Sequence, residues 1–445
     1  MKKSIVFIAL LAASFMHAQD HTLTLKDAVN HALQNKAEAR KARLDIENSN
    51  YQIKEVRSQA LPTLAANGNL TYNAILQESA LPAEFFGGEP GSMILVPFGQ
   101  KWISVGGVSL TQNIFDMSVF TGLKAARSTR EFYKANAELT DEQVIERVAT
   151  AYYEVFVARQ RLAVSDSTYI NASKVRDIIK GQFENGLARK IDLDRTTVKL
   201  YNIDTQRQRN RNDVQLRENA LKFLMGMPLE TQITLTDEAI DITPMPMEAE
   251  PDLTRRTEMK VLERQEELLK YQKKSMQAGF YPSLSLNANY SYQGLGQSFP
   301  WFATPADGVF WTDYSSIGLN LRVPIFNGFG TKAKVQQADI QLRKHQEDMR
   351  NSELALRKEY YDARANIENN LVTLNTQREN ATLAQSVLSD TKNNYYNGLA
   401  TLTDLLDAEN ALTEAQNNYN TALLEYKKAE IQLMKAKGEL KTLAQ

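Results

Sequence analysis

The residue types that most often perform chemistry are scarce in this chain and form no recognisable set. Its 445 residues include no cysteine, which excludes disulfides, thiolate metal sites and thiol catalysis. The four histidines, at positions 17, 21, 31 and 345, lie at no metal-ligand spacing from one another or from a carboxylate pair. Since the sequence also lacks a nucleophile–base set and a phosphate-binding loop, it predicts neither an enzyme nor a cofactor site.

Polar residues do recur in a fixed order in two short segments. These are Asn185-Gly186-Leu187-Ala188 followed by Asp192-Leu193, and Asn397-Gly398-Leu399-Ala400 followed by Asp404-Leu405. Each segment predicts a tight turn between two helices. The formal net charge of −1 offers no basic surface for nucleic acid. What the two turns could do therefore depends on the elements that carry them.

The whole chain repeats itself at long range. Pro62-Thr63-Leu64 returns 220 residues later as Pro282-Ser283-Leu284, and Tyr152-Tyr153-Glu154 returns 208 residues later as Tyr360-Tyr361-Asp362. A repeat of this length indicates a duplicated structural half rather than a short solenoid unit. We place the first repeat at 19–225, a connector at 226–251 and the second repeat at 252–445.

Residues 1–18 are expected to be a secretory signal peptide. Lys2-Lys3 precede an apolar stretch from Ile5 to Met16, and Ala18 supplies a small residue for cleavage. A membrane anchor is the alternative, but this stretch is too short to span a bilayer. No other stretch approaches the roughly 20 apolar residues of a spanning helix, so a membrane location would require β-strands closed into a barrel.

Two runs without proline, 98–227 and 325–445, predict very long helices. The expected helices lie at about 25–60, 117–183, 190–225, 252–280, 329–396 and 402–440. A helix of ~65 residues would be ~100 Å long, which is typical of coiled coils or helical tubes.

The last helix carries a regular packing seam. From Leu405 to Ala436, large residues and alanines alternate at a spacing of about 3.5 residues. Arg207, Asn210 and Arg217 interrupt the equivalent seam of the first half. That interruption predicts either a polar neighbour or a shift of register there.

Four segments predict β-strands with one apolar and one polar face. They lie at about 63–76, 102–114, 283–293 and 314–326. Strands of about ten residues with this alternation are typical of transmembrane barrels, and an amphipathic strand of a soluble sandwich is the alternative. At Gly106-Gly107 the alternation shifts phase, which predicts a β-bulge. We expect residues 231–236 to add a short strand in the connector.

Four strands in two hairpins are too few to close a barrel, which needs about eight. Two, three or four copies of the chain would supply eight, twelve or sixteen strands. The hairpin loops, at about 76–101 and 294–313, carry the aromatic pairs Phe85-Phe86, Trp301-Phe302 and Phe310-Trp311. Such residues suit an aromatic girdle or surface loops above it. A disordered loop is the alternative for Phe85-Phe86.

Along nearly all of its mature length, the chain resembles the TolC-like outer membrane efflux proteins. The resemblance rests on the order of these short motifs: Leu23-Thr24-Leu25-Lys26-Asp27-Ala28-Val29, Leu61-Pro62-Thr63-Leu64, Tyr281-Pro282-Ser283-Leu284, Pro324-Ile325-Phe326-Asn327-Gly328, and Gly398 through Asp404 to Asp407. It implies an α+β membrane protein that forms a trimeric 12-stranded transmembrane β-barrel with four strands per chain. A long periplasmic α-helical barrel would continue the β-barrel, and two structural repeats would build the whole.

The resemblance also implies a function. The chain would be a passive exit duct of a tripartite efflux or type I secretion system, in the outer membrane of a Gram-negative bacterium and extending into the periplasm. Its partners would be two further copies in a homotrimer, a periplasmic adaptor (membrane fusion protein), an inner-membrane transporter of the RND, ABC or MFS type, and outer-membrane lipid. No cofactor and no nucleic acid are implied. A periplasmic or secreted coiled-coil scaffold or adaptor without channel activity is the alternative, and the duplicated strand pairs argue against it.

The resemblance assigns roles to the two turns, 183–194 and 395–407. The carboxylates that narrow the periplasmic aperture would be Asp404, Asp407 and Asp192, and helix capping is the alternative role. The tips that contact adaptor or pump would be Asn185, Gly186, Leu187, Arg189, Asn397, Gly398 and Leu399. In some members a basic residue braces the closed state at the position of Ala400. Here the first half carries Arg189-Lys190 instead, so the lock is expected to differ.

Overall fold

The computed structural model describes residues 21–236, 242 and 250–445. The expected signal peptide lies outside these residues, as do residues 237–241 and 243–249 of the expected connector. The chain divides into two compact units. The helical unit comprises the described residues up to 46, 132–264 and 346–445, and the strand unit comprises 47–131 and 265–345.

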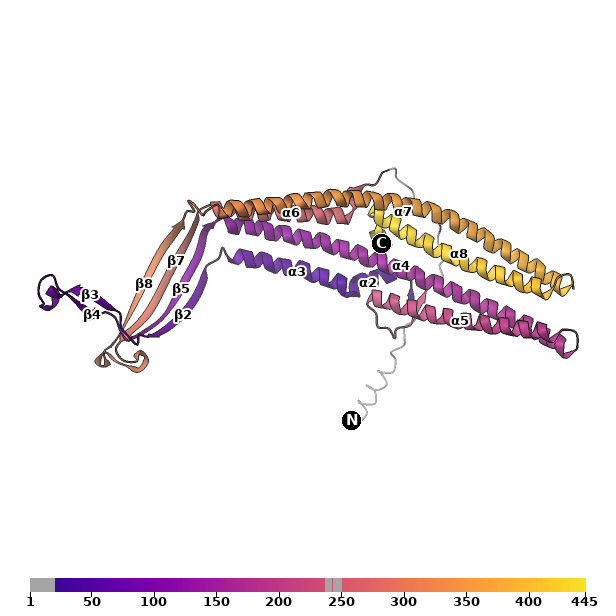
Figure 1. The fold of residues 1–445 in the computed structure, drawn as a ribbon, viewed down its shortest axis with the longest axis horizontal. Helices are drawn as coiled ribbons and strands as arrows, with labels where there is room; N and C mark the ends of the chain where they lie inside the picture. Colours follow the sequence, from indigo (N-terminus) through magenta and orange to yellow (C-terminus); the bar gives the residue numbers. More distant parts are fainter. Residues whose placement is uncertain (1–20, 237–241, 243–249) are drawn as a thin grey trace, which may run out of the picture. The chain divides into compact units, whose positions relative to one another are not determined.

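Helices make up most of the described chain (Figure 1). They are α2 (Leu25–Asn35), α3 (Ala37–Ser58), α4 (Met117–Glu184), α5 (Lys190–Met225), α6 (Thr257–Gln277), α7 (Gly330–Tyr396) and α8 (Leu402–Lys437). The two very long helices are confirmed, since α4 has 68 residues and α7 has 67. None of the helices described is long and apolar enough to cross a membrane.

The strands form three separate sheets. They are β1 (His21–Leu23), β2 (Thr63–Tyr72), β3 (Glu78–Pro82), β4 (Met93–Pro97), β5 (Trp102–Asp116), β6 (Ile233–Leu235), β7 (Ser283–Gly296) and β8 (Val309–Arg322). The strand expected within the connector is confirmed as β6, which pairs in parallel with β1.

The expected single helix over 25–60 is wrong, because the chain forms two helices there. A capping box between Thr24 and Asp27 begins α2, which ends at Asn35. Lys36 then takes an extended conformation, with φ −65° and ψ 132°, and is buried. Its Nζ donates to the carbonyl oxygen of Phe223 at the end of α5, 3.0 Å away. This contact between residues far apart in the sequence interrupts the helix, and local sequence does not reveal it.

The start of α6 has the same arrangement, so the expected helix start at 252 is also wrong. Arg256 is extended, and its side chain is 1% exposed. Its Nη1 donates to the carbonyl oxygen of Ala436 in the last turn of α8, 3.2 Å away. A buried cation therefore satisfies carbonyl oxygens at the end of α5 and again at the end of α8.

Two glycines let these helix ends approach the neighbouring backbone. Gly226 follows α5 and Gly438 follows α8, each with φ 72°. A Cβ at Gly226 would lie 2.9 Å from the carbonyl oxygen of Asn35, and a Cβ at Gly438 would lie 2.6 Å from that of Arg255. Both positions therefore require glycine for backbone conformation and for space.

Glu142 of α4 is buried beside the start of α6. Its Oε1 accepts a hydrogen bond of 2.6 Å from the Thr257 hydroxyl, and the Nζ of Lys441 lies 3.4 Å from the same oxygen. Burial raises the pKa of the Glu142 carboxyl above its ordinary value of 4.5, although Thr257 and Lys441 oppose the shift. Because the charged form is less favourable in the folded chain, this carboxylate lowers stability at neutral pH and ceases to do so below pH 4.5.

We therefore expect Glu142→Gln to raise the melting temperature at pH 7. The neutral amide can accept the Thr257 hydrogen bond without burying a charge. The advantage should vanish as the pH falls below 4.5, where the carboxyl is protonated in both states. Thermal unfolding followed by far-UV circular dichroism at both pH values measures this. A lower melting temperature at pH 7 would show that the Lys441 pair outweighs the cost of burial.

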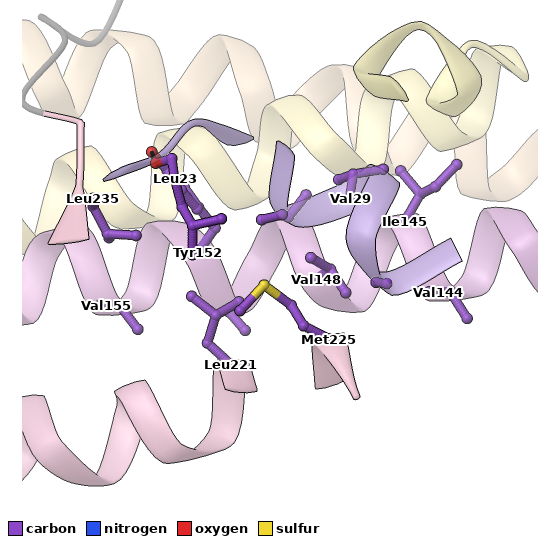
Figure 2. Packing of buried hydrophobic residues seen from close by; sticks show 14 of the residues in the cluster. Leu23, Val29, Val144, Ile145, Val148, Tyr152, Val155, Leu221, Met225 and Leu235 are labelled. Atoms are coloured by element: carbon purple, nitrogen blue, oxygen red, sulfur yellow. Dashed lines mark hydrogen bonds between the residues drawn. The ribbon is translucent and has the colours of Figure 1, made fainter. Parts of the chain in front are cut away.

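The main core lies where α4 meets α2 and the end of α5. Figure 2 shows Val144, Val148 and Val155 of α4 near Val29 and Leu221. The Tyr152 hydroxyl donates to the carbonyl oxygen of Leu23 in β1 at 3.1 Å, so this buried ring also has a polar partner. The core thus holds together the short β1–β6 sheet, α2, α4 and the end of α5.

The seam expected on α8 is confirmed. The residues buried along it include Leu405, Ala408, Ala422, Tyr426, Ala429, Leu433 and Ala436. In the other helix pair, the interrupting residues face polar partners on α4. Asn210 donates to the Ser165 hydroxyl, and the Arg217 guanidinium lies 3.1 Å from Glu154. Of the two alternatives, a polar neighbour is therefore the one observed.

The larger antiparallel sheet of the strand unit has the order β2-β5-β7-β8. Leu286 lies opposite Leu319, and Ser285 lies opposite Asn320, so the predicted apolar and polar faces match across the pairs. β8 begins at Val309, earlier than expected. The strand pairs thus join edge to edge into a single sheet.

The bulge predicted at Gly106-Gly107 is wrong. Both glycines pair without interruption, and the register shifts between Asn113 and Phe115. The apparent change of phase arises because Ile103 and Val105 place apolar side chains on the otherwise polar face. Gly107 serves close approach, since a Cβ there would lie 2.4 Å from the Ser291 hydroxyl oxygen.

Candidate aperture at the two helical turns

The two turns have the same backbone geometry. After α4, Gly186 has φ 75°, and the Leu187 amide donates to the carbonyl oxygen of Gln182 at 2.8 Å. After α7, Gly398 has φ 74°, and the Leu399 amide donates to that of Asn394 at 2.8 Å. This is the Schellman termination that glycine favours.

The side chains of the turns also correspond. Asn185 donates to the carbonyl oxygen of Gly181 and Asn397 to that of Asn393. Leu187 is 81% exposed and Leu399 is 79% exposed, so each turn ends in an uncovered apolar side chain. The recurring Asn-Gly-Leu sequence therefore produces two matching tips.

Asp404 caps α8. It forms a capping box with Thr401, whose amide and hydroxyl donate to Asp404 Oδ2 at 2.8 and 2.7 Å. These hydrogen bonds lower the pKa of the exposed Asp404 carboxyl. The capping alternative thus describes the contacts of Asp404 within one chain.

Asp192 occupies the corresponding place in α5, but its partner is a cation. The residue before α5 is Arg189, which cannot cap with its side chain. Its Nε lies 3.0 Å from Asp192 Oδ2 and its Nη2 lies 3.3 Å from Oδ1. The Arg189 hydrogen bond lowers the pKa of the Asp192 carboxyl. The first turn thus carries an ion pair where the second turn has a capping box.

Asp407 differs from the other two carboxylates. It is exposed and accepts no hydrogen bond from any described residue. It lines an open pocket of about 590 Å³ between α5 and α8, together with Arg195 and Lys199. Of the three predicted carboxylates, Asp407 is thus the one without a hydrogen-bond partner among the described residues.

A small apolar cluster holds the tips together. Val175, Ile179 and Leu405 are buried, and Tyr395 and Leu193 pack against them. Sequence reasoning missed Tyr395, although a tyrosine three residues before the turn glycine was visible. Burial raises the pKa of the Tyr395 hydroxyl, and the nearby Asp192 charge adds to that shift. Residues of α4, α5, α7 and α8 therefore meet directly behind the predicted aperture residues.

An ion pair joins α5 to α8 just behind the tips. The Lys199 ammonium donates to the carbonyl oxygen of Leu406 at 3.0 Å and to the Glu409 carboxylate at 3.1 Å. Glu409 is only 8% exposed. Because each charge is largely removed from water, this pair fixes the position of α5 relative to α8.

Comparison with known proteins gives one consistent result. The sequence profile described as outer membrane efflux protein matches residues 28–227 and 252–439. The outer membrane protein TolC of Vibrio cholerae is 24% identical over 341 residues, which cover 75% of this chain and 76% of that protein. The cation efflux system protein CusC of Escherichia coli is 21% identical over 401 residues, covering 87% and 80%.

A solved structure agrees at the level of the fold. The Neisseria gonorrhoeae MtrE outer membrane channel superposes with a TM-score of 0.73 at 19% identity, covering 95% of this chain and 90% of that one. The profile match spans both sets of long helices and both strand pairs. The chain belongs to the outer membrane efflux protein family and is an outer-membrane protein of a Gram-negative bacterium.

Proposed function

We propose that three copies of this chain form a passive exit duct through the outer membrane, as part of a tripartite efflux or type I secretion system. The observation that carries the proposal is the state of the four-stranded sheet. Among the strands that the structure describes, β2 and β8 each pair on one side only, and Leu319 and Leu321 on the apolar face are 66% and 63% exposed. Unpaired edges and an uncovered apolar face both require further partners.

A trimer and a lipid bilayer supply these partners together. Three sheets joined edge to edge give twelve strands, and closure leaves no free edge. The apolar faces would then contact lipid, and the Ser, Thr and Asn faces would line a water-filled lumen. The long helices would continue the duct into the periplasm.

The division into two repeats is part of this proposal. The repeats are 19–225 and 252–445, joined by the connector 226–251, after a signal peptide at 1–18. Its support is the matching of the two turns, and of the helix ends at Gly226 and Gly438. Two similar halves per chain would give the helical tube near-sixfold regularity from three chains.

The two tips would meet a periplasmic adaptor and an inner-membrane transporter of the RND, ABC or MFS type. The exposed Leu187 and Leu399 offer apolar contacts, and Arg189 offers a cation. Asp404, Asp407 and Asp192 would lie near the axis of the closed aperture. The duct itself would perform no catalytic step, and the transporter would supply the energy.

The trimer is the first expectation to test. The chain should leave outer membranes in mild detergent as a folded trimer, because a single sheet cannot close. Native mass spectrometry or light scattering with detergent correction measures the copy number. A stable folded monomer with four-stranded sheets intact would overturn the proposal.

The aperture carries a second prediction. Asp404→Asn combined with Asp407→Asn should reduce the cation preference of single channels in planar bilayers, because six carboxylates would leave the aperture of a trimer. Block by divalent cations from the periplasmic side should weaken too, since these ions favour clustered carboxylate oxygens.

The single variants separate the two roles. Asp407→Asn removes a free carboxylate and should change selectivity without loss of stability. Asp404→Asn replaces the charged acceptor of the capping box with a weaker neutral amide oxygen and should lower the melting temperature. If a folded Asp407→Asn channel keeps wild-type selectivity and divalent block, Asp407 does not line the aperture.

A further inference from the structure

The two loops beyond the same end of the sheet behave differently. The β7–β8 loop, 297–308, folds back onto its own sheet. Trp301 Nε1 donates to the Ser104 hydroxyl at 3.0 Å, and the Phe299 ring lies 5.2 Å from that of Trp102. The β2–β5 loop instead forms a hairpin of its own, β3–β4, which Figure 1 draws apart from the larger sheet.

This hairpin, Glu78–Pro97, was not predicted, and we call it the mouth hairpin. It leaves many large apolar side chains exposed. These are Phe85 at 81%, Leu95 at 67%, Met93 at 63% and Phe86 at 59%, with Phe98 just beyond it at 66%. A two-stranded hairpin alone is marginally stable in water, and clustered exposed apolar residues mark an interaction surface. A second surface must therefore cover it.

The charge of the hairpin helps to identify that surface. Glu78, Glu84 and Glu89 are acidic, and residues 74–100 contain no lysine or arginine. Such a segment is repelled by an anionic lipid surface, where basic residues would be expected. The acidic residues do not prevent contact between neighbouring copies, because exposed charges more than about 8 Å apart are screened at physiological salt. An apolar protein surface is thus the better match.

Resting on the proposed trimer, we propose that the mouth hairpin packs against the β7–β8 loop of the adjacent copy. The hairpin grows out of β2, the edge strand whose free side would pair with the β8 of that copy. Phe302 in the β7–β8 loop is 89% exposed and Phe310 at the start of β8 is 61% exposed, so this surface is also uncovered.

The distances allow this contact. Neighbouring strands lie about 4.8 Å apart, so the loop of the adjacent copy begins within roughly 15 Å of the hairpin base. Five residues of β3 extend about 17 Å. The hairpin can therefore cross the boundary between two copies and bury apolar side chains from both. Three such contacts between neighbouring copies would stabilise the outer end of the trimer.

Cross-linking tests the inference directly, because the chain has no cysteine of its own. A Phe86→Cys copy and a differently tagged Phe302→Cys copy are produced together and treated in outer membranes with a short bis-maleimide. We expect a cross-linked heterodimer that carries both tags. The matched control replaces Phe302→Cys with Lys332→Cys, an exposed position in the first turn of α7, beyond the other end of β8, and should give no cross-linked heterodimer.

Each outcome is decisive. Trimers without the Phe86–Phe302 heterodimer overturn the inference and leave the proposed function standing. Phe86 homodimers alone would mean that hairpins meet one another, which also overturns it. A monomeric chain overturns both.

A second measurement does not depend on cross-linking. Phe85→Ser with Phe86→Ser should lower the temperature at which trimers dissociate on gels, whereas Glu89→Ser should not. Equal dissociation temperatures for both variants and the wild type would contradict the proposed contact between copies.

Discussion

Arg256→Met is expected to destabilise the helical unit by about 3 kcal/mol, because removal of one partner from a buried ion pair leaves the other charge uncompensated. The Arg256 guanidinium lies 2.8 Å from both Glu258 and Glu359 and also serves the carbonyl oxygen of Ala436. All of these contacts lie within the helical unit. Methionine fills similar space but replaces none of them.

Arg364→Met is the control variant that isolates the effect of burial on an arginine ion pair. Arg364 pairs with Glu368 on the same helix, and their side chains are 39% and 53% exposed. Such an exposed pair contributes about 0.3–0.5 kcal/mol. Thermal unfolding by far-UV circular dichroism should therefore separate the two variants clearly. Equal losses of stability in the two variants would show that burial of Arg256 adds nothing to the effect of its ion pairs.

The pH dependence supplies a second signature. Burial alone would raise the pKa of the Glu258 carboxyl, but the Arg256 hydrogen bond and charge lower it below 4.5 overall. A lowered pKa gives stability that is present above pH 4.5 and is lost as the pH falls through the folded-state value. The difference in the free energy of unfolding between wild type and Arg256→Met should therefore become smaller at acidic pH. Adding Glu258→Gln and Glu359→Gln to Arg256→Met should recover part of the loss at neutral pH.

The sequence predicted those features whose causes are local. The tips follow from Asn-Gly-Leu, because glycine at φ near 75° and asparagine suit this helix termination. The long helices and the alternating strands follow from periodicity in the same way. Interruptions at Lys36 and Arg256 were missed, because their cause is a carbonyl oxygen about 180 residues away in the sequence.

The candidate aperture also has features that were predicted from the sequence and features that were not. Motif matching located Asp404 and Asp192 at equivalent helix starts, and the structure places both there. It did not note that Thr401 holds one carboxylate and Arg189 the other, although the residue three positions earlier in each turn carries that information. Nor could it find the mouth hairpin, whose two short strands are obscured by prolines and by an irregular apolar sequence.

The exposed aromatic residues locate the apolar band of the sheet. Tyr290 and Tyr292 of β7 lie toward one end, where the Tyr292 ring stacks on Trp311 with centroids 5.0 Å apart. Tyr281 and Phe326 lie just beyond the other end and are 52% and 74% exposed. Transmembrane barrels carry aromatic residues at both interfaces. The residues between these two groups should therefore contact the hydrocarbon core.

Leu319→Arg should destabilise the membrane-inserted protein by about 2–4 kcal/mol, whereas Asn320→Arg should have a much smaller effect. Leu319 lies opposite Leu286, midway between the two aromatic groups, and Asn320 is the next residue of the same strand. The two positions thus share a depth and differ in the face they occupy. An arginine at 319 would meet lipid, where its charge has no water, and an arginine at 320 would extend into the lumen.

The measurement is the urea dependence of folding into lipid vesicles, followed by tryptophan fluorescence. Leu286→Arg and Ser285→Arg form a second matched pair on β7 and should reproduce the contrast. Each pair places arginine at two adjacent positions of one strand. The two variants of a pair therefore do not differ in the helices or in the tips. Equal losses at both faces would mean that the apolar face does not contact lipid, and a larger loss at Asn320 would mean that the faces of the barrel are reversed.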